Sequence, residues 1–132
     1  MNFIAWNVRG LNDPLKQRAI VDRVRSLKSS LVCLIETRVK ENKKQPIVDK
    51  LFNGWSMLNN YSSAYNGRIW ILWNQLLHVD LLTSTDPCIT CTISYDSKQM
   101  VISAVYGSND GMDRRNLWNQ LCIMSGSMSQ KP

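Results

Sequence analysis

The sequence has few of the residues that mark zinc-binding or disulfide-bonded proteins. It contains 132 residues, with one histidine and four cysteines. Cys88 and Cys91 have the C-x-x-C spacing of zinc ligands, but a structural zinc site needs a second pair of ligands. Cys33 and Cys122 lie in apolar segments, where a buried free thiol is the usual state. We therefore expect free thiols, a reducing compartment, and neither zinc nor a small-molecule cofactor.

Long apolar segments are also missing. No segment approaches the roughly 18 consecutive apolar residues of a membrane-spanning helix, and Asn7 and Arg9 interrupt the N-terminal segment that would otherwise suit a signal peptide. We expect an intracellular protein of the nucleus or cytoplasm, with no membrane partner. The 132 residues, 44% of them hydrophobic and 20% charged, predict one globular domain at most.

Acidic residues are fewer than basic residues in the first part of the chain. The formal net charge is +6, and residues 1–50 contain eleven Lys and Arg against five Asp and Glu, whereas residues 51–132 contain five of each kind. The first 50 residues therefore carry the whole basic excess. This asymmetry favours an anionic partner such as DNA or another nucleic acid, although a solvated, Lys- and Arg-rich helix face would give the same counts.

Two short apolar segments near the N-terminus each end in a polar residue. Residues 3–6 are followed by Asn7, and residues 31–35 are followed by Glu36. An amide and a carboxylate side by side suit a hard cation such as Mg²⁺, or a phosphate held by one. Taken singly, Asn7 fits a turn at the end of a strand as well as it fits a ligand role. Glu36 alone is more typical of a solvated carboxylate than of a metal ligand.

A helix is expected between these two segments. Asp13 is placed to cap it, Pro14 suits its first position, and an apolar stripe continues to about Lys28. A strand, helix and strand in succession form a right-handed crossover, which makes the two strands parallel. We therefore expect Asn7 and Glu36 to converge at one edge of a sheet.

The rest of the chain predicts a loop over residues 37–44, a short helix over residues 47–52, and then strands. An antiparallel meander that continues the same sheet is favoured by five apolar or alternating segments, residues 55–59, 68–73, 77–82, 88–95 and 99–106. A last helix is expected over about residues 112–124. Such a sheet, with helices on one face, would leave its other face bare, so we expect the isolated chain to aggregate or to be loosely packed.

Four segments agree in order and spacing with one known family. They are Phe-Ile-Ala-Trp-Asn-Val-Arg-Gly-Leu at residues 3–11, Leu-Ile-Glu-Thr-Arg at 34–38, Val-Tyr-Gly-Ser-Asn at 105–109 and Arg-Arg-Asn-Leu-Trp at 114–118. Together they resemble the endonuclease/exonuclease/phosphatase superfamily, and most closely the endonuclease domain of plant LINE-type (non-LTR) retrotransposons. The resemblance implies an α+β fold, the N-terminal half of a four-layer αββα sandwich, with one mixed sheet and helices on one face. Residues 1–132 would then be a partial domain without its C-terminal half.

The same resemblance implies a Mg²⁺-dependent endonuclease ancestry with four site residues. Glu36 would be the main Mg²⁺ ligand, and Asn7 would help to position the metal and the scissile phosphate. Tyr106 would contact the phosphate, and Asn109 would line the same pocket. The basic residues expected to contact nucleic acid are Arg9, Arg38 and Lys40.

Later motifs of that family are absent from residues 1–132. They are a Gly-Asp-x-Asn strand, whose Asp orients or activates the attacking water, and a Ser-Asp-His motif, whose His pairs with the phosphate. The resemblance therefore implies a catalytically incomplete hydrolase. Two alternatives stay open: a phosphatase of the same superfamily that acts on inositol phosphates or lipids, and a non-enzymatic basic module that binds nucleic acid.

Overall fold

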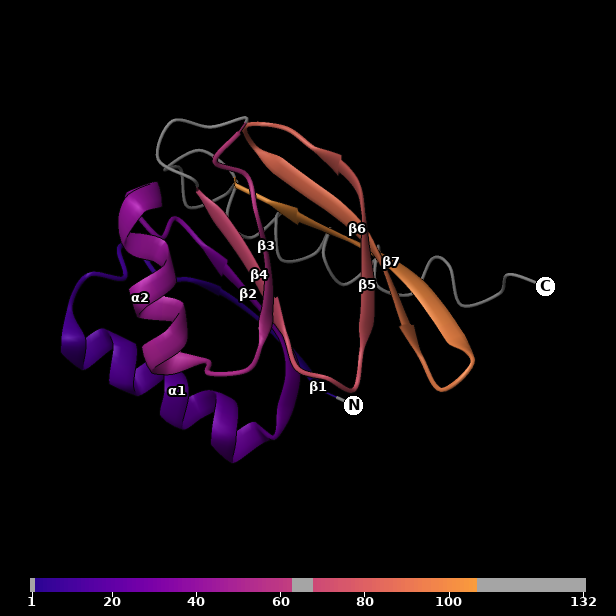
Figure 1. Cartoon of the computed structure of the whole chain (residues 1–132), viewed down its shortest axis with the longest axis horizontal. Helices are drawn as coiled ribbons and strands as arrows, with labels where there is room; N and C mark the ends of the chain where they lie inside the picture. Colours follow the sequence, from indigo (N-terminus) through magenta and orange to yellow (C-terminus); the bar gives the residue numbers. More distant parts are fainter. Residues whose placement is uncertain (1, 63–67, 107–132) are drawn as a thin grey trace.

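Alternating and continuous apolar segments produce a layered α+β arrangement (Figure 1). The computed structural model of the chain describes residues 2–62 and 68–106. The elements within these residues are β1 (Asn2–Asn7), α1 (Pro14–Leu27), β2 (Ser29–Ile35), α2 (Glu41–Leu51), β3 (Ser56–Asn59), β4 (Ile69–Trp73), β5 (His78–Ser84), β6 (Cys88–Tyr95) and β7 (Lys98–Val105). The expected helix over residues 112–124 lies outside the described residues.

The crossover from β1 through α1 to β2 forms as the sequence predicts. The side chain of Asp13 accepts a hydrogen bond from the main-chain N–H of Leu15 at 3.0 Å, and Pro14 occupies the first turn of α1. The helix ends at Lys28, whose left-handed φ of 51° closes the last turn. β1 and β2 pair in parallel, so the expected crossover is confirmed.

The first sheet has the strand order β1-β2-β4-β3, and β4 runs antiparallel to both of its neighbours. Both α1 and α2 cover one face of this mixed sheet (Figure 1). Residues that pack between the helices and the sheet include Ile20, Val24, Val48, Phe52, Val32, Leu34, Trp70 and Leu72. The predicted mixed sheet with helices on one face is therefore confirmed.

Strands β5, β6 and β7 form a second, antiparallel sheet, so the expectation that they continue the first sheet is wrong. The second sheet packs against the face of the first sheet that the helices leave open (Figure 1). The core between the sheets includes Leu31, Cys33, Ile35, Ile69, Ile71, Ile89, Cys91, Ile93, Ile102 and Ala104. The expected bare face is likewise wrong, because β2 and β4 are apolar on both faces and each face is covered.

Helix α2 begins at Glu41, within the segment expected to be a loop. The Glu41 carboxylate stabilises the first turn of the helix, because a negative charge interacts favourably with the helix N-terminus. The ammonium group of Lys44 lies 4.0 Å from this carboxylate and 5.6 Å from the centre of the Tyr61 ring. The polar composition of residues 37–44 therefore belongs partly to a solvated helical turn.

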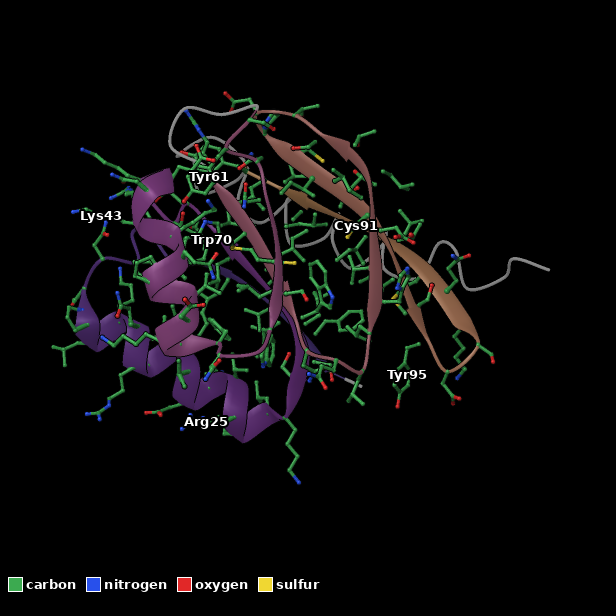
Figure 2. The ribbon with its side chains drawn as sticks, viewed as in Figure 1. Arg25, Lys43, Tyr61, Trp70, Cys91 and Tyr95 are labelled. Carbon is green, nitrogen blue, oxygen red and sulfur yellow. The ribbon has the colours of Figure 1, made fainter. Side chains whose placement is uncertain are left out.

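A buried tyrosine supports the loop between β2 and α2. The Tyr61 hydroxyl donates to the carbonyl oxygen of Val39 at 2.7 Å and accepts from the indole N–H of Trp70 at 3.1 Å (Figure 2). Burial raises the pKa of Tyr61, which keeps its hydroxyl protonated and able to donate. The loop that follows Glu36 is thus held against the helix-covered core. None of the helices in residues 2–62 and 68–106 has the length and apolar composition needed to cross a membrane.

Candidate metal and phosphate site

The two parallel strands end side by side. Asn7 is the register partner of Ile35, and the pairing continues past the strands. The main-chain N–H of Val8 donates to the Ile35 carbonyl at 2.9 Å, and that of Gly10 donates to the Glu36 carbonyl at 2.8 Å. Asn7 and Glu36 therefore leave neighbouring strands at the same edge of the first sheet, as expected from the crossover. We call the edge formed by the ends of β1 and β2, the start of β4 and the end of β7 the site edge.

Asn7 brings an unpaired acceptor to the site edge. Its side-chain oxygen Oδ1 is buried and has no hydrogen-bond partner among the described residues. Leaving a buried acceptor unpaired costs about 1–3 kcal/mol. An oxygen in this state is suited to a cation or to a donor supplied by a ligand.

Glu36 is a buried carboxylate on an unusual backbone. Its exposed fraction is 8%, and its φ of 62° lies in the left-handed region, which few residues with a Cβ adopt. Within the described part of the chain, the carboxylate has one partner, because Oε2 accepts a 2.8 Å hydrogen bond from Nη2 of Arg38. An ionised carboxylate has about four acceptor positions, so most of its capacity stays open.

Left-handed backbone conformations occur in both loops at this edge. Arg9 has a φ of 49°, Glu36 a φ of 62° and Arg38 a φ of 56°. Gly10 has a φ of 102°, which only glycine adopts without strain. Left-handed residues with a Cβ cost roughly 1–3 kcal/mol each and are enriched at ligand-binding sites.

Tyr106 comes from the second sheet but reaches the same edge. Its main-chain N–H donates to the carbonyl oxygen of Pro87 at 2.6 Å. The guanidinium carbon of Arg68 lies 4.6 Å from the centre of the Tyr106 ring. Arg68 in turn accepts a 2.6 Å hydrogen bond at its carbonyl oxygen from the N–H of Glu36. One residue thus contacts both Glu36 and Tyr106.

Asn60 joins the two sheets beneath this edge. It is completely buried, and its side-chain Nδ2 donates to the carbonyl oxygens of Thr85 at 3.1 Å and Asp86 at 2.7 Å. Its Oδ1 accepts from the N–H of Ile69, the first residue of β4, at 3.0 Å. Both donors and the oxygen of one buried amide therefore link the β5–β6 turn to the first sheet.

The sequence pattern did not anticipate Arg68, Asp86 or Asn60. Arg68 and Asp86 form a loose ion pair, with Nε and Oδ1 3.5 Å apart. One sequence signal was available for Arg68, because it immediately precedes β4, and an antiparallel β4 begins where β2 ends. No comparable signal exists for Asn60, whose partners lie at least nine residues away in the chain.

No protein-family model and no curated protein matches the sequence. Solved structures do match. The AP endonuclease LMAP of Leishmania major is 21% identical with a TM-score of 0.60, and the alignment covers 89% of this chain and 43% of that one. The endonuclease domain of TRAS1, a telomere-specific non-LTR retrotransposon, is 12% identical with a TM-score of 0.61, covering 85% and 49%. D. rerio TDP2 with a single-strand DNA product is 14% identical with a TM-score of 0.58, covering 98% and 55%.

The described residues share the fold of these endonuclease and TDP2 structures. The chain spans about half the length of these three structures, since 43–55% of each is covered. At identities of 12–21% the likeness establishes the fold, and it agrees with the sequence resemblance to an N-terminal part.

Within this fold, the oxygens at the site edge fit Mg²⁺. No group of three or more His, Cys, Asp and Glu side chains that could hold a metal ion occurs in the described residues. Mg²⁺ does not require such a group, because it keeps several waters and is commonly bound through one or two carboxylates and a substrate phosphate. The open carboxylate of Glu36 and the unpaired Oδ1 of Asn7 provide that minimal set. His78 lies at the start of β5, whereas the β5–β6 turn at the site edge follows the end of that strand. His78 is therefore at the other end of β5 from the proposed metal ligands.

The predicted nucleic-acid-binding residues are solvent-exposed in the two loops that follow β1 and β2. Arg9 follows β1, and Arg38 and Lys40 follow β2. The ammonium group of Lys16 donates to the carbonyl oxygen of Val8 at 2.8 Å, which ties α1 to the first loop. Asn109, the remaining predicted site residue, lies outside the described residues.

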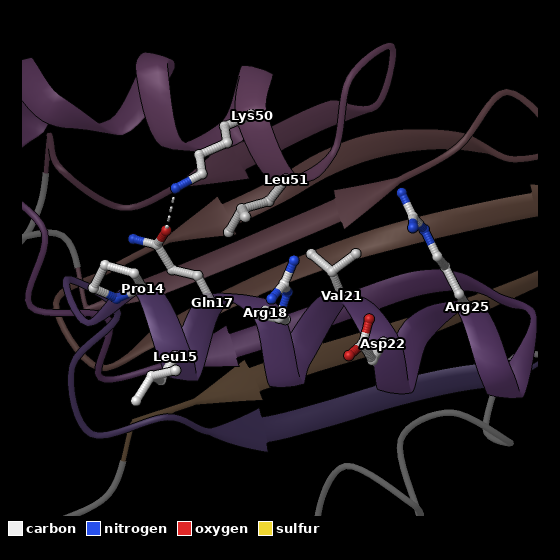
Figure 3. Close-up of a pocket in the computed structure, with 9 residues that line it drawn as sticks. All are labelled: Pro14, Leu15, Gln17, Arg18, Val21, Asp22, Arg25, Lys50 and Leu51. Carbon is white, nitrogen blue, oxygen red and sulfur yellow. Dashed lines mark hydrogen bonds between the residues drawn. The ribbon is translucent and has the colours of Figure 1, made fainter.

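Part of the basic excess lies elsewhere, on the helix layer. A groove of about 390 Å³ separates α1 from the last turn of α2, with Arg18, Arg25 and Lys50 at its rim (Figure 3). Lys50 donates to the side-chain oxygen of Gln17 at 3.3 Å, whereas Arg18 and Arg25 form no ion pair within the described part of the chain. The basic composition therefore reflects both a charged helix face and a charged site edge.

Proposed function

We propose that the chain is the N-terminal part of a Mg²⁺-dependent phosphodiester-cleaving nuclease related to the endonucleases of LINE-type (non-LTR) retrotransposons. We further propose that residues 1–132 are catalytically incomplete alone. The proposal rests on the buried Oδ1 of Asn7, which has no hydrogen-bond partner among the described residues and lies at the end of β1, next to the strand that leads into Glu36.

Nucleic acid as the substrate class is supported by two kinds of observation. The matched structures include an AP endonuclease, a retrotransposon endonuclease domain and a TDP2 solved with a single-strand DNA product. The loops that follow β1 and β2 also carry exposed basic residues, and phosphate contacts by such residues supply most of the affinity for a nucleic-acid backbone.

Each residue of the site edge then has a defined task. Glu36 holds Mg²⁺ through its open carboxylate positions, and Asn7 supplies a neutral oxygen beside it. When bound, Mg²⁺ stabilises charge on the phosphate and on the leaving oxygen. Tyr106 contacts the phosphate from the second sheet. Asn109, which lies outside the described residues, is assigned to the same phosphate from the sequence resemblance. Arg38 fixes the Glu36 carboxylate through the 2.8 Å hydrogen bond to Oε2.

The chain should nevertheless fail to cleave DNA by itself. Residues 1–132 contain neither the Gly-Asp-x-Asn nor the Ser-Asp-His motif of the family that the sequence resembles. Losing the group that activates the attacking water typically lowers a rate about 10²–10⁴-fold. Losing an electrostatic partner of the phosphate lowers it by about another 10²–10³-fold. Nicking of supercoiled plasmid that requires Mg²⁺ and disappears in Glu36→Ala would overturn this part of the proposal.

The metal site is testable without cleavage. Titration of the purified chain with Mn²⁺, a spectroscopic substitute for Mg²⁺, should reveal binding by electron paramagnetic resonance, and Mg²⁺ should compete. Glu36→Gln should abolish the binding and Asn7→Ala should weaken it. Glu41→Gln is the matched control, because Glu41 is an exposed carboxylate in the first turn of α2. Equal Mn²⁺ binding by wild type and Glu36→Gln would refute the assignment.

A non-enzymatic nucleic-acid-binding module is the second candidate. It is favoured by Arg18 and Arg25 beside the helix groove, which form no ion pair with any residue that the structure describes. That function predicts a salt-dependent gel shift that persists in EDTA and in Glu36→Gln. It also predicts that the shift disappears when Arg18 and Arg25 are both replaced by alanine. The proposed nuclease origin predicts instead that divalent ions strengthen binding through Glu36.

A further inference from the structure

Arg68 occupies the junction of the two sheets at the site edge. Its carbonyl oxygen accepts the N–H of Glu36 at 2.6 Å, its guanidinium stacks on the ring of Tyr106 at 4.6 Å, and its Nε lies 3.5 Å from the Asp86 carboxylate. We propose that Arg68 binds a phosphate group of the nucleic acid, with Tyr106 holding its guanidinium in place. The inference rests on the proposed function, since it adds a residue to the same site.

The chemistry of the guanidinium group supports this assignment. Arginine has five N–H donors in one plane. Stacking on an aromatic ring uses the face of that plane and leaves the donors at its edge available. The Arg68 side chain is 43% exposed, so these donors can reach a ligand. A planar array of donors matches phosphate oxygens in pairs, which gives direction as well as attraction.

The partner carboxylate leaves most of this capacity unused. At 3.5 Å between Nε and Oδ1, with the Asp86 side chain 55% exposed, the Arg68–Asp86 pair is loose and solvated. Such exposed pairs contribute little to stability. Arg38 differs, because its Nη2 is committed to Glu36 at 2.8 Å. Arg68 is therefore the less committed of the two guanidinium groups that flank the Glu36 backbone.

The position of Arg68 is also fixed relative to the proposed metal ligand. Asn60 bonds the carbonyl oxygen of Asp86 at 2.7 Å and the N–H of Ile69, the residue after Arg68, at 3.0 Å. The main chain on both sides of the Arg68–Asp86 pair is thus tied to one buried amide. This rigidity would present a phosphate-binding group at a constant place beside Glu36.

Binding of fluorescently labelled single-stranded oligothymidylate, measured by anisotropy in EDTA, tests the inference. Arg68→Ala should weaken binding about 10-fold or more, since hydrogen bonds to charged groups contribute about 1.5–3 kcal/mol. It should also reduce the slope of log affinity against log salt by about 0.7, the value for one phosphate contact on a single strand. Arg68→Lys should bind with intermediate affinity because it keeps the charge without the planar donors.

Two further variants separate phosphate binding from a structural role. Asp86→Asn should tighten binding more in the wild-type background than in Arg68→Ala, because it frees the Arg68 guanidinium from a competing carboxylate as well as removing a negative charge. Equal gains in the two backgrounds would show that Arg68 does not bind the phosphate. Arg23→Ala is the matched control, since Arg23 is an exposed arginine of α1 that does not line the helix groove. It should leave affinity unchanged. Affinity for Arg68→Ala equal to that for Arg23→Ala would overturn the inference.

The same binding measurement repeated in Ca²⁺ distinguishes failure of the Arg68 inference from failure of the proposed function. Ca²⁺ should strengthen binding by wild type and by Arg68→Ala, but not by Glu36→Gln. If the Ca²⁺ effect depends on Glu36 while Arg68→Ala binds like wild type, only the Arg68 inference is wrong. If wild type binds no oligothymidylate in either buffer, both are wrong. If Arg18→Ala weakens binding and Arg68→Ala does not, the helix groove is the binding surface and Arg68 is not.

Discussion

The main-chain N–H of Glu36 donates a 2.6 Å hydrogen bond to the carbonyl oxygen of Arg68. This bond continues the antiparallel pairing of β2 with β4 by one residue past the end of β2, and it forms with Glu36 at a φ of 62°. The left-handed conformation and the bond together turn the chain sharply at the point where the carboxylate is needed. A glycine would adopt this conformation with less strain, so the glutamate is retained at a cost in stability.

Replacing Glu36 by glycine should therefore remove the carboxylate without destabilising the fold. We expect Glu36→Gly to have a free energy of unfolding equal to that of wild type or up to about 1 kcal/mol higher, because glycine relieves the left-handed strain. Mn²⁺ binding should be lost in the same variant. Urea unfolding in EDTA and Mn²⁺ titration are the measurements.

Lys28→Gly provides the control for this comparison. Lys28 has a φ of 51° at the end of α1 and is exposed. Its replacement by glycine should give a similar gain in stability while Mn²⁺ binding is retained. A large loss of stability in Glu36→Gly alone would mean that the Glu36 side chain is structural.

Asn60 should be among the most sensitive polar residues of the described chain. Asn60→Ala leaves the N–H of Ile69 and two carbonyl oxygens of the β5–β6 turn without their partner. We expect a loss of about 3 kcal/mol or more in the free energy of unfolding, since each buried polar group left unpaired costs about 1–3 kcal/mol. Asn53 is exposed and follows α2. Asn53→Ala should therefore change the free energy of unfolding by less than about 0.5 kcal/mol. Similar losses in the two variants would show that the sheets are not joined through Asn60.

The edge that holds Asn7 and Glu36 was predictable because it depends on local rules. A capped helix between two apolar segments fixes the handedness of the crossover, and parallel strands then end together. The partner sheet of β5 to β7 was not predictable in the same way. Alternating residues indicate which faces of a strand are buried, but not which sheet the strand joins. The early start of α2 was missed because a charged first turn has the composition of a loop.

The contacts of Arg68 and Asn60 depend on how distant segments pack. Asn60 contacts residues 85 and 86 across the two sheets, and Arg68 meets Tyr106 from the far end of the described chain. Neither relationship leaves a periodic signal in the sequence. Both sets of contacts follow from the way the two sheets pack face to face.

Two buried thiols predict a loss of stability in alkali. Burial raises the pKa of Cys33 from its ordinary value of 9.0, and it raises the pKa of Cys91 to about 12. In the unfolded chain both thiols ionise near their ordinary pKa, so the unfolded state releases protons first. Their contribution to stability is complete below about pH 9 and falls as the pH rises toward 12, by at most about 1.4 kcal/mol per pH unit for each thiol.

Urea unfolding of wild type and Cys91→Ala at about pH 8 and about pH 10.5 measures this effect. The loss between the two pH values should be smaller in Cys91→Ala, because one titrating thiol is gone. Ile93→Ala is the matched control, since it opens a cavity in the same core without removing a thiol. It should lower stability equally at both pH values. An identical alkaline loss in wild type and Cys91→Ala would contradict the thiol explanation.

The most direct test of the metal site is anomalous diffraction from crystals of the chain soaked in Mn²⁺. We expect a peak at the ends of β1 and β2, within about 2.0–2.4 Å of a Glu36 carboxylate oxygen and on the side of Asn7 Oδ1. The peak should be absent from crystals of Glu36→Gln. A peak only at the His78–Asp80 pair, whose Nε2 and Oδ2 are 3.1 Å apart on β5, with none at Glu36, would contradict the assignment of Asn7 and Glu36 as a metal site.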